Sequence, residues 1–255
     1  ISVPDNTKIW FNTASGDFWI SNMKNGLSAD AASGNMKLKN ISGEITMNTA
    51  SGDVSLQKIS GELKITTASG NIKIESLDAK TSISVASGDI NIIENMQDVK
   101  ISTASGNVNI EGNKGNLKAN IASGDVQITK STGACNINTA SGDINASEIE
   151  LTDESSFSAA SGDIEVALNK SPEKDLSLST ASGNITLDYN GNEVSGFFEF
   201  TARKDKGKII SPYKFDIEEV FEKDGKKYDK KSFTKGSDSP KVVLKTSSGN
   251  VELKK

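Results

Sequence analysis

The stretch Thr49-Ala50-Ser51-Gly52-Asp53-Val54-Ser55-Leu56 decides the fold of this chain. The same pattern returns in the next copy as Thr67-Ala68-Ser69-Gly70-Asn71-Ile72-Lys73-Ile74. A repeat at a fixed short period indicates stacked structural units that bury a continuous core. Regularly spaced copies of Ala-Ser-Gly-Asp/Asn begin at Ala14, Ala32, Ala50, Ala68, Ala86, Ala104, Ala122 and Ala140. Stretched copies begin at Ala160 and Ala181, and Ser247-Ser248-Gly249-Asn250 is the last.

The coil itself divides into two nine-residue units, because Ile41-Ser42-Gly43-Glu44 and Ile59-Ser60-Gly61-Glu62 lie midway between copies. Each unit contains an apolar-x-apolar alternation, which is typical of a β-strand with one buried face. The sequence therefore predicts an all-β fold, a single-stranded parallel β-solenoid with about 11 coils of about 18 residues. Parallel connections are strongly right-handed, which favours a right-handed β-helix. A left-handed hexapeptide helix has a similar coil length, but the nine-residue sub-period argues against three six-residue sides.

The period breaks after Leu187 and returns near the end of the chain. We predict a β-solenoid over 1–187, an insertion over 188–241 and a final solenoid coil over 242–255. Residues 201–241 carry twelve Lys/Arg and eight Asp/Glu, and the insertion is rich in aromatic residues. Asp224-Gly225 is a strong two-residue turn signal, so we expect a β-hairpin from Phe215 to Phe233. The insertion would serve as a C-terminal cap or buttress, or as a basic and aromatic contact surface for an acidic glycan.

The repeated turn is predicted to be structural. Its members include Ser51, Gly52 and Asp53 in one copy, and Ser69, Gly70 and Asn71 in the next. Glycine allows a turn with positive φ or a close backbone approach. Asp and Asn alternate after it, and they share a carbonyl acceptor, so we expect an Asx turn rather than a ligand site.

One exception in the turn column concerns metal binding. Asp125, Asp143 and Asp163 are acids in three consecutive coils, and they are weak candidates for a cation site. A calcium-binding β-roll also uses nonapeptides, but its second glycine and its ligand spacing are missing here. We therefore expect no metal and no cofactor.

Threonines recur immediately before the Ala-Ser-Gly copies, as at Thr49, Thr67 and Thr103. A flat threonine ladder is one way to bind ice. The same column also holds Val85 and Ile121, so we expect semi-buried packing instead.

Partner contacts are expected where the repeat is interrupted. Trp10 and Trp19 fall in outward columns of the first coils, where they either bind a partner or cover the open end of the solenoid. In the insertion, the candidates for partner contact are Phe215, Lys226, Lys227 and Tyr228.

Composition excludes several classes of function. The formal charge of −5 argues against a nucleic-acid binder. Histidine, the commonest general base and metal ligand, is absent from the sequence. The single cysteine, Cys135, falls in an inward column, where a thiol is usually inert. Any membrane contact would come through a segment outside this sequence.

The Thr-Ala-Ser-Gly-Asp/Asn-apolar-x-apolar pattern resembles the bacterial putative-adhesin family of repeat-rich cell-envelope proteins. The resemblance covers about residues 9–187 and 242–253, and it implies an extracytoplasmic location at the cell surface. It leads us to expect a non-enzymatic adhesin or rigid interaction rod with a surface glycan, envelope polymer or protein as partner. The alternatives are a sensing scaffold for envelope stress and a polysaccharide-active β-helix enzyme, whose chemistry would need only two carboxylates.

Overall fold

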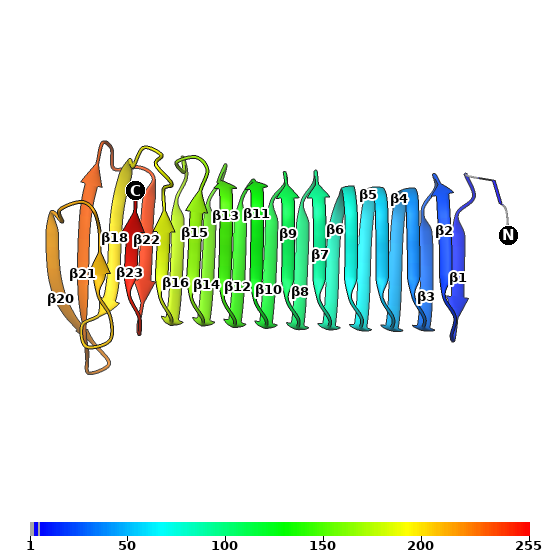
Figure 1. Ribbon diagram of the computed structural model, residues 1–255, viewed down its shortest axis with the longest axis horizontal. Helices are drawn as coiled ribbons and strands as arrows, with labels where there is room; N and C mark the ends of the chain where they lie inside the picture. The colour runs from blue at the N-terminus through cyan, green and yellow to red at the C-terminus, as the bar shows by residue number, and fades with distance from the viewer. Residues whose placement is uncertain (1–2, 5) are drawn as a thin grey trace. The chain divides into compact units, whose positions relative to one another are not determined.

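The computed structural model describes residues 3–4 and 6–255, and its elements are all β-strands. The chain divides into two compact units, Ile1–Ser123 and Gly124–Lys255. The strands of the first unit are β1 (Ile9–Thr13), β2 (Phe18–Met23), β3 (Leu27–Ser33), β4 (Met36–Ser51), β5 (Val54–Ser69), β6 (Ile72–Ser87), β7 (Ile90–Asn95), β8 (Val99–Ser105), β9 (Val108–Asn113) and β10 (Leu117–Ser123). Within each unit, the strands of successive coils run side by side (Figure 1).

Strand pairing in the first unit follows the repeat of the sequence. β4 pairs with β5 in parallel, and Val54 of β5 pairs in turn with Ile72 of β6. The pairings in this unit join equivalent positions of successive copies, as in Phe18 with Met36 and Thr81 with Val99. The predicted parallel β-solenoid with an 18-residue coil is therefore confirmed.

The core of the solenoid consists of the inward columns of each coil. Ile45, Leu63, Ile74 and Ile83 are each at most 1% exposed. Fully burying such a side chain contributes about 1.5–3 kcal/mol. Because identical columns stack coil on coil, each coil completes the core of its neighbours, and no single coil is stable alone.

Backbone positions with positive φ recur in the coils and mark their corners. The predicted Ser-Gly corner has glycines with positive φ, for example 127° at Gly52. A second corner, six residues further on, has a residue in the left-handed region in eight successive copies: Asn22, Asn40, Lys58, Ser76, Glu94, Gly112, Lys130 and Glu148. For residues such as Lys58 and Glu94 this conformation costs about 1–2 kcal/mol. The sequence alone does not predict this corner, because residues of several types occupy the position. In the first coils, Gly26, Gly43 and Gly61 add a third position with positive φ.

The second unit begins with the same solenoid pattern. Its strands are β11 (Val126–Thr132), β12 (Cys135–Ser141), β13 (Ile144–Glu150), β14 (Ser155–Ser161), β15 (Ile164–Leu168), β16 (Leu176–Ser182), β17 (Ile185–Asp188), β18 (Gly196–Arg203), β19 (Ile209–Ile210), β20 (Ile217–Lys223), β21 (Lys226–Lys235), β22 (Lys241–Thr246) and β23 (Val251–Lys254). The parallel pairs β12–β14 and β14–β16 continue one side of the coil, and β13–β15 and β15–β17 continue the other.

The last strands of the chain lie between two earlier segments. β22 pairs in parallel with β16 on one side and with β18 on the other, and β23 likewise pairs with β17 and β19. Residues 196–210, within the range expected as an insertion, therefore supply a further pair of coil strands beyond the C-terminal coil (Figure 1). Periodicity alone could not show this, because the Ser-Gly-Asx motif is missing from 196–210.

The predicted hairpin closes this end of the second unit. β21 pairs with β18 in antiparallel fashion, and β20 pairs with β21 around Asp224-Gly225, whose φ values are 51° and 69°. Two consecutive positive φ values are typical of the two-residue hairpin turn that Asp-Gly favours. The hairpin prediction is therefore confirmed.

An aromatic cluster fills the space beneath the hairpin. Phe198 and Phe200 are fully buried, and the ring centroid of Phe233 lies 4.7 Å from that of Phe198. Phe215 meets Phe200 edge-on at 5.8 Å, and Lys231 Nζ lies 4.9 Å from the Phe215 ring. Phe215, expected to contact a partner, is thus half-buried in the structure of the cap.

Candidate functional site

The Ser-Gly-Asx column is a hydrogen-bond ladder between coils. Asn35 Oδ1 accepts the backbone N–H of Asp53 at 3.0 Å, and Asp53 Oδ1 accepts that of Asn71 at 2.8 Å. The expected need for a carbonyl acceptor is correct, but the expected Asx turn is wrong, since the donor belongs to the next coil. Both Asp and Asn fit this role, because either side chain offers the acceptor.

The three consecutive aspartates belong to the same ladder. Asp125 Oδ1 accepts the N–H of Asp143 at 2.9 Å, and Asp143 Oδ1 accepts that of Asp163 at 2.8 Å. Asp163 in turn accepts the N–H of Asn184 at 2.7 Å. Over residues 3–4 and 6–255, no group of three acidic or cysteine side chains is arranged to hold a metal ion. The ladder thus explains the position of these aspartates without a ligand.

The threonine column faces inward. Thr49, Thr67 and Thr103 are 3–7% exposed. Their hydroxyls donate to the backbone carbonyls of Ser51, Ser69 and Ser105 at 3.0–3.1 Å. Since the hydroxyls are already bonded within the chain, the column is semi-buried packing, as expected, and does not offer a free hydroxyl array.

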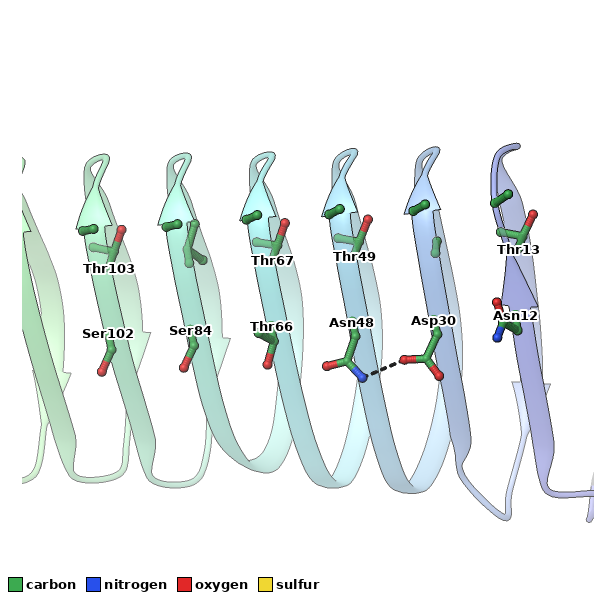
Figure 2. A pocket seen from close by; sticks show the side chains of 18 of the residues that line it. Asn12, Thr13, Asp30, Asn48, Thr49, Thr66, Thr67, Ser84, Ser102 and Thr103 are labelled. Atoms are coloured by element: carbon green, nitrogen blue, oxygen red, sulfur yellow. Dashed lines mark hydrogen bonds between the residues drawn. The ribbon is translucent and has the colours of Figure 1, made fainter.

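A long groove of about 1040 Å³ runs along one side of the first unit. Its lining repeats in each coil: a polar outward residue, the threonine column and the exposed alanine that precedes Ser-Gly (Figure 2). The polar residues are Asn12, Asp30, Asn48, Thr66, Ser84, Ser102 and Asn120. Asn48 donates from Nδ2 to Asp30 Oδ1 at 2.8 Å, and Asp30 is the one titratable residue of the lining. Sequence reasoning missed this groove, although its columns were visible in the repeat.

The two tryptophans are outward-facing in the first coils. Trp10 of β1 is 73% exposed and Trp19 of β2 is 75% exposed. The ring of Phe11 lies 4.6 Å from that of Phe18, which is buried. The tryptophans are thus outward-facing and exposed, as their columns predicted, and the half-buried Phe11 packs against the buried Phe18.

A second, smaller concavity lies at the tip of the hairpin in the second unit, and we call it the hairpin-tip pocket. It has a volume of about 370 Å³ and is lined by Arg203, Lys204, Asp205, Gly225, Lys226 and Lys227. Lys226 and Lys227 were predicted as contact residues, whereas Arg203 and Lys204 were not. Tyr228, the other candidate, is half-buried and stacks on Phe221 at 5.4 Å.

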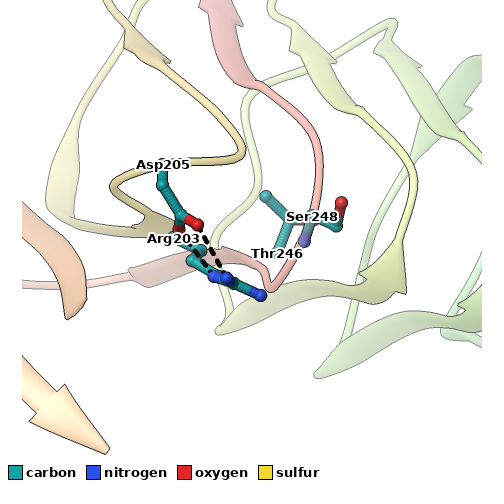
Figure 3. Close-up of polar contacts among 4 residues, drawn as sticks. All are labelled: Arg203, Asp205, Thr246 and Ser248. Atoms are coloured by element: carbon teal, nitrogen blue, oxygen red, sulfur yellow. Dashed lines mark hydrogen bonds and ion pairs between the residues drawn. The ribbon is translucent and has the colours of Figure 1, made fainter. Parts of the chain in front are cut away.

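Within the hairpin-tip pocket, Arg203 and Asp205 form a two-pronged ion pair. Arg203 Nε and Nη2 donate to the two carboxylate oxygens of Asp205 at 2.6 and 2.7 Å. Figure 3 shows the guanidinium directed at this carboxylate, with Thr246 and Ser248 on the neighbouring segment. The hydrogen bonds from Arg203 hold the pKa of Asp205 below its usual range.

Three other lysines near the hairpin surround the carboxylate of Glu199. Glu199 has 11% of its side chain exposed, with Lys245 Nζ at 3.1 Å, Lys230 Nζ at 3.3 Å and Lys241 Nζ at 4.0 Å. Burial alone would raise the pKa of Glu199, but Lys245 and Lys230 outweigh it and lower the pKa. These lysines therefore help to hold strands β18, β21 and β22 together.

Cys135 is buried in the core of the second unit. Burial raises the pKa of its thiol to about 12, while a hydrogen bond with Ser131 acts weakly in the opposite direction. A thiol that stays protonated is a poor nucleophile.

The part of the chain that contains most of the repeats matches a known family model. The family model described as Toastrack DUF4097 matches residues 1–114 and 93–207, which together cover most of the sequence. The chain belongs to the Toastrack DUF4097 family. The Toastrack matches include the groove and Arg203 to Asp205, whereas Lys226 and Lys227 lie beyond them. No curated protein and no solved structure gave a significant match to this Toastrack chain. Among the residues with described positions, no helix has the length and apolar character to cross a membrane.

Proposed function

We propose that this protein is a non-enzymatic interaction protein of the bacterial cell envelope, located outside the cytoplasm. In this proposal the groove of the first unit adheres to an extended, repetitive partner such as a surface glycan. The observation that supports it most is the groove itself, whose lining repeats once per coil.

The chemistry of the lining suits a polymer of hydroxylated units. Asn48, Thr66, Ser84 and Ser102 offer both donors and acceptors along one wall. The alanine methyl groups beside them offer an apolar strip, as the faces of sugar rings require. Successive coils are about 4.8 Å apart, so equivalent groups recur along the whole groove. A ligand with its own repeat gains from many weak contacts in register.

The same lining favours binding over catalysis. Glycoside hydrolysis uses a pair of carboxyl groups on either side of the bond that breaks. The groove contains a single titratable side chain, Asp30, and Asp30 is hydrogen-bonded to Asn48. A binding protein needs no such pair, because its affinity comes from the summed contacts of the surface.

This function can be tested with a glycan-array screen that compares the wild type with a variant whose groove is filled by a larger side chain. Ala68 is exposed in the centre of the lining, so Ala68→Arg fills the groove without entering the core. The matched control is Ala160→Arg, an exposed alanine of the same column that lies outside the groove. We expect glycan binding by the wild type and the control, and at least a tenfold loss, or about 1.4 kcal/mol, in Ala68→Arg. Equal binding by both variants, or no binding to any glycan, would refute the proposal.

Location is tested separately. Protease treatment of intact cells that express the full gene should digest the protein if it lies outside the cytoplasm. Protection in intact cells with digestion after lysis would contradict the proposed location.

A further inference from the structure

The hairpin-tip pocket is formed where two turns of the second unit meet. Arg203 ends β18, and Lys204 and Asp205 occupy the turn that follows it. Gly225 belongs to the hairpin turn, and Lys226 and Lys227 begin β21. Because β18 and β21 are paired strands, with Arg203 opposite Tyr228, the two turns are held at the same edge of the sheet.

Backbone hydrogen bonds fix both walls of this pocket. Lys204 N–H donates to Lys227 C=O at 3.0 Å, which joins one wall to the other. The N–H groups of Lys206 and Gly207 both donate to Arg203 C=O at 3.0 Å and close the first turn. The side chains of the pocket are thus mounted on an ordered frame, which reduces the entropy cost of binding.

The charge of the pocket is strongly positive in an acidic protein. Its lining contains four cations, Arg203, Lys204, Lys226 and Lys227, and one carboxylate, Asp205. The whole chain carries −5. Lys204 Nζ lies 4.0 Å from Asp229, but Lys226 and Lys227 have no ion pair among residues 3–4 and 6–255. In contrast, Lys230, Lys241 and Lys245 all form ion pairs with the carboxylate of Glu199, so their charges are compensated within the protein.

Asp205 occupies the position that an external anion would take. It is 58% exposed in its side chain, and it binds both donors of the Arg203 fork. The guanidinium fork matches carboxylate and phosphate oxygens equally well. The Arg203 side chain is only 23% exposed, so the guanidinium stays in place while the exposed carboxylate of Asp205 is the partner that an incoming anion can replace.

We propose that the hairpin-tip pocket binds a phosphate group of an anionic polymer, with Arg203 passing from Asp205 to the phosphate and Lys226 and Lys227 completing the site. Successive phosphates of such a polymer each bring a negative charge and at least two free acceptor oxygens, so neighbouring phosphates together match the three or four cations that line the pocket. A single carboxylate would leave most of that charge unneutralised. The acidic Asp224 at the hairpin turn disfavours insertion of this tip into an anionic membrane.

Titration with linear inorganic polyphosphate tests this site, with the intact chain and Kd measured over a series of salt concentrations. In Lys226→Ala/Lys227→Ala, which changes only exposed side chains, we expect affinity to fall by about tenfold or more, with a shallower salt dependence. The control with the same loss of charge is Lys37→Ala/Lys39→Ala in the first unit, which should bind nearly as well as the wild type.

Two further variants address the exchange of anions. Asp205→Asn removes the competing carboxylate and should tighten polyphosphate binding several-fold. Arg203→Lys removes the planar pair of N–H donors of the guanidinium and should weaken polyphosphate binding. A purely structural Arg203–Asp205 pair would instead lower the unfolding temperature in Asp205→Asn and leave Kd unchanged. The proposal is overturned by equal affinity of both double-lysine variants, by equal binding of polyglutamate, or by binding to phosphatidylglycerol vesicles without binding to polyphosphate.

Discussion

Replacing Gly70 by alanine should strongly destabilise the first unit. Gly70 has φ of 133°, a conformation that side chains with a Cβ rarely adopt. A Cβ at this position would lie closer than 3.0 Å to the backbone carbonyl oxygen of Gly52 in the preceding coil. Backbone on a stacked coil cannot rotate away as a flexible side chain can, so the two coils must separate locally.

The structure allows an estimate of the cost. The strained backbone contributes about 1–3 kcal/mol. In the wild type, Gly52 N–H donates to Ser69 C=O at 3.2 Å and Gly70 N–H donates to Ser87 C=O at 3.1 Å. Separating the coils also weakens these two hydrogen bonds. Each such bond contributes about 1 kcal/mol. We therefore expect a loss of about 3–5 kcal/mol, a large part of the stability of an ordinary domain.

Urea unfolding followed by circular dichroism measures this loss, and amide hydrogen exchange locates it in neighbouring coils. The informative control is Gly112→Ala. Gly112 also has positive φ, 73°, but the nearest atom to its added Cβ would be 3.6 Å away. This variant should lose only about 1 kcal/mol. If Gly70→Ala costs no more than Gly112→Ala, the close approach of coils is not the reason for the glycine column.

Two further predictions concern buried groups. Asn95 is fully buried and donates from Nδ2 to Asn113 Oδ1 at 2.6 Å. Asn95→Leu should cost about 1–3 kcal/mol in urea unfolding, and Asn95→Leu/Asn113→Leu should cost less than the sum of the single variants; strict additivity would contradict this coupling. The raised pKa of Cys135, about 12, means that the folded state keeps the thiol protonated, so stability should fall as pH rises from 9 towards 12. Cys135→Ala should remove that part of the pH dependence, and an unchanged profile would show that the thiol is not its source.

The fold could be predicted from the sequence because each coil repeats the same short-range sequence pattern. The apolar-x-apolar alternation, the Ser-Gly corner and the Asp224-Gly225 turn all act within a few residues of the chain. The predicted hydrogen-bond donor to the Asx side chains was wrong. An Asp or Asn acceptor gives the same sequence pattern whether its donor lies in the same turn or in the next coil. The corner at Lys58 and Glu94 left no signal, because stacking enforces a conformation that these residues do not prefer.

The candidate sites depended more on tertiary structure. Lys226 and Lys227 were found by charge and position, but Arg203 joins them only because β18 and β21 pair. The groove likewise needs coils in register before its columns line one surface.

The sequence by itself determined the parallel β-solenoid, its 18-residue coil and the terminal hairpin, because these follow from short-range periodicity and turn chemistry. Only the tertiary structure decided that β22 and β23 lie between two pairs of earlier strands, and which cations share a pocket. The physical reason is that pairing between distant strands is chosen by the burial of Phe198, Phe200 and Phe233, which is a property of the assembled end and not of any local segment.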